Sequence, residues 1–220
     1  MPDTLESLLA SARLWRGANA AHAAASAAAG AVPSGYDALD ACLPGGGWPE
    51  CGLIELLLDE HGIGELQIVM PLLRRANPGS TGTTEARWIA WLAPPFLPYA
   101  PALQKAGLVL ERQLIVRTLQ TKEVWWAMEQ VLRSGTCAAV LGWAGKAEGH
   151  TLRRLKLAAE QSGSAGLLFR STRYRSQTSP ANVRAVLRGV EADLEVEIFK
   201  SQGGRTGRVR VSASGLGVSG

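Results

Sequence analysis

Cysteine and histidine are scarce in this chain, which has three of each among its 220 residues. No two cysteines have Cys-x-x-Cys spacing, and the histidines lie apart from them, so the sequence carries no readable metal site or disulfide framework. Long apolar runs are missing too, since Ile89–Ala93 is far shorter than the roughly 20 residues of a membrane span. Asp3 and Glu6 precede the alanine-rich stretch near the start, which argues against a signal peptide. These absences predict a cytoplasmic protein without metal or membrane segment.

A phosphate-binding motif is absent as well. An apolar run from residue 53 is followed by a glycine loop, which is where such a motif would be expected. A P-loop needs G-x-x-x-x-G-K-[ST], but Glu65 stands where the lysine should be, and residues 50–65 contain five acids and no lysine or arginine. A carboxylate about 4 Å from a phosphate charge costs on the order of 4 kcal/mol at an effective dielectric of about 20. The apolar run that ends at Trp143 supplies no carboxylate for magnesium. We therefore expect a degenerate loop, comprising Gly62, Gly64 and Glu65, and no catalytic residue or cofactor.

Short apolar runs alternate with helical stretches from residue 53 onward, which predicts an α/β fold with a largely parallel sheet. After Pro180 the pattern changes to strands joined by turns, so we expect an antiparallel extension at the C-terminal side. The predicted strands are Leu53–Leu58, Trp88–Ala93, Leu114–Arg117, Cys137–Trp143, Gly166–Arg170, Val183–Gly189, Leu194–Lys200 and Arg208–Ser212. The predicted helices are Glu65–Ala76, Tyr99–Ala106, Thr121–Ser134 and His150–Ser162.

Four segments are expected along the chain. Residues 1–17 have apolar side chains at helical spacing and predict an amphipathic helix. Residues 18–32 form an alanine-rich linker, residues 33–200 the core, and residues 201–220 a basic tail rich in glycine and serine. The tail matters for charge, because residues 1–199 hold as many acids as bases and Lys200 with three arginines supplies the net charge of +4. The helix and the tail predict a partner-binding surface, with the candidates Leu5, Leu8, Leu9, Trp15, Arg205, Arg208 and Arg210.

Several segments together resemble a known family. The segment SGYDALDACLPGGGWPECGLIELL resembles the start of the RecA core. ELLLDEHGIGE, RWIAWLAPPFLPYAPAL, WWAMEQVLRSG, AAVLGW and RSTRYRSQTSPANVRAVLRG resemble ImuA, the RecA-like accessory protein of bacterial translesion DNA synthesis. The resemblance runs over about residues 32–212, and it implies a RecA-like core flanked by helices.

The same resemblance implies a function in the SOS response to DNA damage. It implies a non-catalytic adaptor in mutagenic translesion synthesis, with an ImuB-type protein, an error-prone DNA polymerase and RecA as partners, DNA as a weak additional contact, and self-association as a further expectation. Two alternatives stay open. A SulA-type cell-division inhibitor, related more distantly to the same family, would make cells filament, and a diverged P-loop NTPase would bind Mg-ATP through backbone amides near Gly62 and Gly64.

Overall fold

The computed structural model describes residues 30–77, 87–117 and 120–212. Its strands are β1 (Ala31–Val32), β2 (Trp48–Pro49), β3 (Gly52–Leu57), β4 (Trp88–Leu92), β5 (Gln113–Val116), β6 (Cys137–Trp143), β7 (Ala165–Arg170), β8 (Val183–Val190), β9 (Asp193–Ser201) and β10 (Gly207–Ser212). Its helices are α3 (Asp37–Asp40), α4 (Met70–Ala76), α5 (Ala100–Lys105), α6 (Thr121–Ser134) and α7 (Gly149–Ser162), with short 3-10 turns η1 (Pro44–Gly46), η2 (Leu110–Arg112) and η3 (Thr172–Tyr174). Within these ranges, no helix has the length and apolar character required to cross a lipid bilayer.

One mixed sheet of eight strands organises the described chain, in the order β10-β9-β8-β3-β7-β6-β4-β5. The strands from β8 through β3 to β5 are parallel to their neighbours, whereas β8, β9 and β10 are joined to one another as antiparallel hairpins. β3 lies inside the sheet with neighbours on both sides, and all six of its residues are buried. The sheet therefore has two edges of different origin, β5 at the parallel end and β10 at the antiparallel end.

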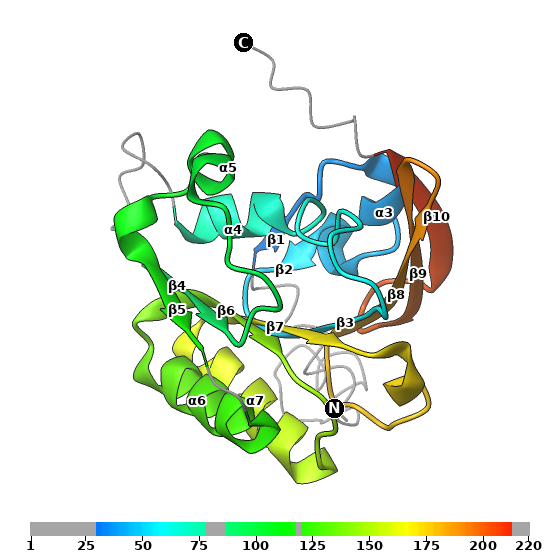
Figure 1. Ribbon diagram of the computed structural model, residues 1–220. Coiled ribbons are helices and arrows are strands. Elements are labelled where there is room, and N and C mark those ends of the chain that lie inside the picture. The colour runs from blue at the N-terminus through cyan, green and yellow to red at the C-terminus, as the bar shows by residue number, and fades with distance from the viewer. Residues whose placement is uncertain (1–29, 78–86, 118–119, 213–220) are drawn as a thin grey trace, which may run out of the picture.

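The two faces of the sheet are covered unequally. Figure 1 shows α6 and α7 side by side on one face, and α4 and α5 on the other together with the segment that holds β1, β2 and α3. Helices α6 and α7 have 14 residues each, and each ends at a left-handed glycine, Gly135 or Gly163, which is the usual way to stop a helix without steric cost. The opposite face carries only helices of seven residues or fewer within the described ranges. Irregular chain consequently covers much of that face.

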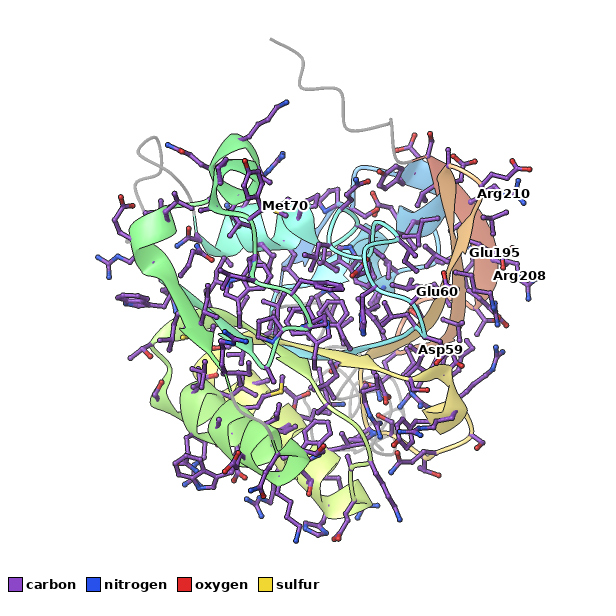
Figure 2. All side chains as sticks on the ribbon, viewed as in Figure 1. Asp59, Glu60, Met70, Glu195, Arg208 and Arg210 are labelled. Carbon is purple, nitrogen blue, oxygen red and sulfur yellow. The ribbon has the colours of Figure 1, made fainter. Side chains whose placement is uncertain are left out.

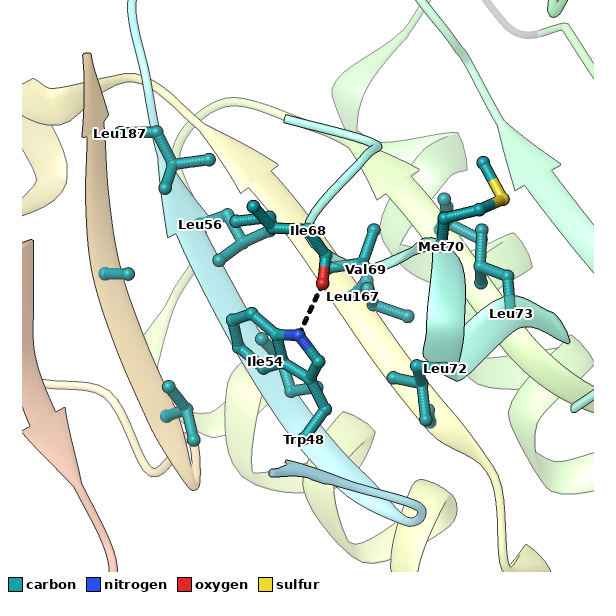
Figure 3. Packing of buried hydrophobic residues seen from close by; sticks show 14 of the residues in the cluster. Trp48, Ile54, Leu56, Ile68, Val69, Met70, Leu72, Leu73, Leu167 and Leu187 are labelled. Carbon is teal, nitrogen blue, oxygen red and sulfur yellow. Dashed lines mark hydrogen bonds between the residues drawn. The ribbon is translucent and has the colours of Figure 1, made fainter. Parts of the chain in front are cut away.

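The irregular covering is held by a buried tryptophan. Trp48 is fully buried, and its indole Nε1 donates a hydrogen bond of 2.6 Å to the carbonyl oxygen of Ile68 (Figure 3). Ile68 and Val69 are themselves fully buried and pack in the same cluster as Ile54 of β3. The chain between β3 and α4 is thus held in place by Trp48 and by the burial of Ile68 and Val69, although it contains no regular helix or strand.

A buried charge cluster joins β3 to its two neighbours. The carboxylate of Glu55, fully buried on β3, accepts hydrogen bonds from the guanidinium groups of Arg170 on β7 and Arg184 on β8, the latter at 2.6 Å. Removing Glu55 would leave two buried guanidinium groups without their carboxylate, which costs several kcal/mol. Arg184 also donates to the backbone carbonyls of Tyr174 and Gln177, so the cluster fixes the connection between β7 and β8.

The prediction of a RecA-like core with a largely parallel sheet flanked by helices is wrong. The sheet is mixed, with three of its eight strands linked by antiparallel pairing, and only two helices in the described ranges exceed seven residues. The helix predicted for Glu65–Ala76 begins only at Met70, because Gly62 and Gly64 adopt left-handed backbone angles and Pro71 is suited to the first turn of a helix. The tail predicted from residue 201 is partly strand, since β9 ends at Ser201 and β10 covers residues 207–212.

Candidate partner-binding surface

The loop after β3 contains the residues predicted to form a degenerate phosphate site. Glu65 is buried, and both of its carboxylate oxygens accept the backbone N–H of Gly62, at 3.0 and 3.1 Å. Gly62 and Gly64 have φ angles of 83° and 99°, which favour glycine. The carboxylate therefore satisfies an amide of its own loop, which is a structural role. The hypothesis of a P-loop that lost its lysine is not supported.

Asp59, at the start of the same loop, ties it to the end of β7. Its carboxylate accepts hydrogen bonds from the hydroxyl groups of Ser171 and Thr172 and from the backbone N–H of Thr172. These hydrogen bonds, those of the Thr172 and Ser171 hydroxyls above all, lower the pKa of Asp59 from its ordinary value. The carboxylates of Asp59 and Glu65 are thus bonded within the protein.

The basic residues predicted as a partner site near the C-terminus lie on or beside β10. Arg208 and Arg210 alternate with Val209 and project from the outer strands beside Glu195, as Figure 2 shows. Arg208 lies 3.4 Å from a carboxylate oxygen of Glu197. Arg205 precedes the strand, and its backbone N–H donates to the carbonyl of Cys42.

Glu197 is the centre of this ion-pair network. Its carboxylate receives Arg175, Arg188 and Arg208 from three different segments. Hydrogen bonding from Arg175, opposed by partial desolvation and helped by Arg188 and the remaining charges, lowers the pKa of Glu197 to about 2. Arg208 is therefore already paired within the sheet. Leu5, Leu8, Leu9 and Trp15, the other predicted contacts, lie outside the described residues.

The most exposed apolar side chains of the described chain lie elsewhere, in the segment between β4 and α5. We define residues 93–99, Ala-Pro-Pro-Phe-Leu-Pro-Tyr, as the apolar loop. Phe96 and Leu97 are each 70% exposed, and Tyr99 is 71% exposed. Three neighbouring large apolar side chains held out in water are unfavourable for an isolated domain, because each would gain about 1.5 to 3 kcal/mol from full burial.

The apolar loop is attached firmly at both ends. Ala93 has a φ angle of 51°, unusual for a residue with a side chain, and its N–H donates to the carbonyl of Val116 at 2.8 Å. The three prolines of the loop restrict its backbone. At the other end, α5 is anchored by the buried side chain of Leu103, and Leu108 is buried just after it. A loop fixed in this way loses little conformational entropy when a partner covers it.

The edge strand β5 is joined to the apolar loop by the hydrogen bond from Ala93 to Val116. Ile115 lies beside Trp91 and Leu114 beside Ala90 in the register with β4, and both β5 side chains are more than one third exposed. Neighbouring residues of a strand face opposite sides of the sheet, so Ile115 is exposed on the side of Trp91 and Leu114 on the other side. Two side-chain amides, that of the buried Asn77 and that of the half-buried Gln113, fix this strand and the turn before it. Gln113 accepts from Trp91 Nε1 at 2.9 Å and donates to Val109, while Asn77 accepts from the N–H of Val109. The apolar loop and β5 form our candidate partner-binding surface.

Comparison with known proteins identifies the family. The family model described as "Cell division inhibitor SulA" matches residues 53–166, slightly more than half of the chain. A cell division inhibitor SulA from Serratia proteamaculans (strain 568) is 30% identical over 125 residues, which cover 56% of this chain and 71% of the relative. The chain belongs to the SulA family. The match contains the whole candidate surface, whereas β8, β9 and β10 lie beyond it.

Two further similarities complete the comparison. The SulA of Edwardsiella piscicida is 29% identical to this SulA-family chain over 147 residues, covering 64% of the chain and 82% of the relative. The crystal structure of SulA from Pseudomonas aeruginosa has a TM-score of 0.43 and 24% identity, and the match covers 54% of this chain and 97% of that one.

Family membership corrects the expected function. The identification with ImuA is wrong, and with it the role in translesion synthesis and the predicted partners, namely an ImuB-type protein, an error-prone polymerase, RecA and DNA. The expectation of a degenerate nucleotide site is unsupported for the same reason. Because a division inhibitor is not an enzyme, the prediction of a non-catalytic protein holds at that level, although its rationale does not.

The residues of the apolar loop were not among the sequence-based candidates. Pro94, Pro95 and Phe96 entered the sequence analysis as part of the segment RWIAWLAPPFLPYAPAL, which carried the resemblance to ImuA. A usable signal was present, since large apolar residues interleaved with prolines directly after a strand cannot join a helix or a sheet, and exposed apolar clusters mark interaction sites.

Proposed function

We propose that this chain inhibits cell division by binding a protein of the division machinery through the apolar loop and β5. Family membership supports the process, and the exposure of Phe96, Leu97 and Tyr99 supports the place. The chain acts in the cytoplasm, as a stoichiometric binder without turnover. Aromatic side chains dominate the energetics of many protein interfaces, so Phe96 and Tyr99 are the anchors that we expect to contribute most.

The proposal predicts that substitutions in the apolar loop abolish the inhibition of division without unfolding the protein. The chain is expressed in a bacterium whose own relative is deleted, and cell length is measured by microscopy. Wild-type chain produces filaments, whereas the triple variant F96A/L97A/Y99A produces cells of normal length. The matched control is L157A, which removes an exposed leucine from α7 and keeps filamentation.

Thermal unfolding of the purified proteins keeps this test interpretable. Because all three replaced side chains are about 70% exposed, the triple variant should unfold within a few degrees of wild type. Filamentation by a normally folded and expressed triple variant would refute the apolar loop as the binding site. Failure of the wild-type chain to cause filaments would refute division inhibition itself.

Other candidate contacts remain predictions under this proposal. The N-terminal segment with Leu5, Leu8, Leu9 and Trp15, the linker that follows it, and the basic residues Arg205, Arg208 and Arg210 are proposed to strengthen partner binding. Deleting residues 1–17, or reversing the charge of the three arginines, should then weaken inhibition without abolishing it. Unchanged filamentation in both variants would restrict the interface to the apolar loop and β5.

A further inference from the structure

A cleft with a volume of about 590 Å³ lies between the beginnings of α6 and α7 and the segment that follows β6. It is on the face of the sheet that carries α6 and α7, whereas α5, next to the apolar loop, lies on the other face (Figure 1). Its size is that of a small-molecule site, since such sites are typically about 300 to 1,000 Å³. The cleft is therefore distinct from the candidate partner-binding surface and from the loop after β3.

Two adjacent tryptophans give the cleft its apolar lining. Trp125 is nearly buried, and its Nε1 donates a hydrogen bond of 3.0 Å to the backbone carbonyl of Lys146, which joins α6 to the segment after β6. Trp126 is 65% exposed although it is the larger kind of aromatic side chain. An indole that is fixed on a helix and open to solvent provides a platform on which a planar ring can stack.

The charges around the cleft favour an anion. Lys122 and Lys146 line the cleft, and neither has an ion pair within the described ranges. Two carboxylates, those of Glu129 and Glu148, also line it. Arg154 makes a two-point contact with Glu129, which Arg133 approaches at 3.7 Å, so that carboxylate is neutralised within the protein.

Glu148, the other carboxylate of the cleft, repels a bound anion only weakly because water screens its charge. The side chain of Glu148 is 74% exposed, and its carboxylate lies 3.2 Å from the imidazole of His150. Counting the lining residues at neutral pH, three cations face two carboxylates. The two free lysines are therefore the groups available to a ligand phosphate.

Backbone geometry adds to this preference. The first turns of α6 and α7 both border the cleft, and neither helix has a side chain that caps its N-terminus. Uncapped N–H groups and the positive end of the helix dipole favour an anion. The cleft also lies past the carboxyl end of β6, and ligands of open α/β sheets bind outside the carboxyl ends of the strands.

We propose that this cleft binds a nucleoside 5′-monophosphate. The base stacks on the exposed indole of Trp126, and the phosphate lies between Lys122 and Lys146. A stacking platform next to unpaired lysines matches a ring joined to a phosphate better than it matches either part alone. No bond is made or broken, because binding is the whole of the proposed event.

Calorimetric titration of the full chain tests the proposal with AMP, adenosine and inorganic phosphate as separate probes. AMP is expected to bind at least tenfold more tightly than adenosine or phosphate. W126A should weaken AMP binding about tenfold, as the loss of one base-stacking contact does. The double variant K122Q/K146Q should weaken it by a similar or larger factor, whereas the matched controls L157A and K105Q, which replace exposed residues away from the cleft, should not.

Three outcomes would overturn the proposal. They are no saturable binding of AMP at millimolar concentration, equal affinity for AMP and phosphate, and undiminished affinity in W126A. A fourth arm uses the acidic peptide Glu-Glu-Tyr-Glu-Glu. If the peptide binds in a manner that depends on Trp126 while AMP does not bind, the cleft is a site for an acidic segment of a protein and not for a nucleotide. None of these results bears on filamentation, so the proposed function is tested separately.

Discussion

The loops that follow the parallel strands β3 and β4 differ in their side chains and in how those side chains are placed. The loop after β3, residues 58–69, is rich in acids and glycines. The carboxylates of Glu65 and Asp59 nevertheless accept hydrogen bonds from backbone N–H and hydroxyl groups of the protein itself. The apolar loop after β4 holds no acid, and Phe96 and Leu97 remain in water. The carboxylates of Asp59 and Glu65 bond within the protein, whereas the large side chains of the apolar loop are left exposed by the described chain.

The difference shows where a binding site is to be sought. Polar residues near a glycine loop suggest a ligand site, but the carboxylate of Glu65 is buried and accepts the N–H of Gly62 from its own loop. Exposed apolar side chains differ, because they gain free energy only when they are removed from water, and nothing in the described chain covers them. Exposed apolar side chains, and not a missing motif, are therefore the basis of the proposed binding site.

The largest expected contrast in stability is between two aromatic-to-alanine substitutions. Trp48 packs under the loop after β3, and Phe96 belongs to the apolar loop. W48A removes a fully buried indole and its hydrogen bond to Ile68, and should lower the free energy of unfolding by about 3 to 5 kcal/mol. F96A removes a side chain that is 70% exposed and should change it by less than about 0.5 kcal/mol. Urea unfolding followed by circular dichroism measures both.

Function should show the reverse contrast. F96A should shorten the filaments that the chain induces, while W48A should act only through the amount of folded protein. If F96A destabilises the protein as much as W48A does, the apolar loop is part of the core and the comparison fails.

A smaller effect is expected from Glu65, whose role in the loop after β3 is structural. E65Q keeps the shape of the side chain but replaces a charged acceptor of the Gly62 N–H with a neutral one, and should cost about 1 kcal/mol of stability. E60Q is the matched control, because Glu60 is exposed in the same loop and makes no hydrogen bond within the described ranges. Loss of filamentation in E65Q at unchanged stability would give this loop a functional role after all.

Sequence reasoning located most strands within a few residues, because buried parallel strands are continuous apolar runs and the two long helices have clear apolar stripes. It failed for residues 65–69, where the helical spacing of apolar residues reflects packing of irregular chain against Trp48. It also failed for the fold class, because the pairing of β8 with β3 depends on contacts between residues that are distant in the sequence. The partner surface was missed for a related reason, since exposure of Phe96 follows only once the sheet and α5 are in place.

The two loops should also differ in their response to acid. Hydrogen bonds from Thr172 and Ser171 lower the pKa of Asp59 below its ordinary value of 3.8. A lowered folded-state pKa contributes stability that is present above the unfolded value and is lost as the pH falls through the folded value. D59N should therefore flatten the fall in stability below about pH 4, whereas F96A should keep the acid dependence of the wild type.

Unfolding midpoints measured between pH 2 and pH 7 decide this point. Because Asp59 is exposed, the effect is smaller than that of E65Q, and E60Q again serves as the control carboxylate. An acid profile of D59N identical to that of the wild type would show that the bonds from Ser171 and Thr172 do not hold the loop in solution.

The smallest change in stability is expected from W143F, a substitution at a tryptophan within the sheet. Trp143 stacks between Trp91 and Phe169, with ring centroids 6.2 and 4.5 Å away, and its buried Nε1 has no hydrogen-bond partner in the described chain. W143F loses apolar contact area but also removes a donor whose burial costs about 1 to 3 kcal/mol, so the two terms nearly cancel and stability should change by less than about 1 kcal/mol. W91F makes the same change of ring at a tryptophan that donates to Gln113, and it should cost at least 1 kcal/mol more, because Gln113 then loses its partner on β5. Equal costs in the two variants would mean that Trp143 Nε1 is satisfied in solution, and that the support of β5 does not depend on the hydrogen bond from Trp91.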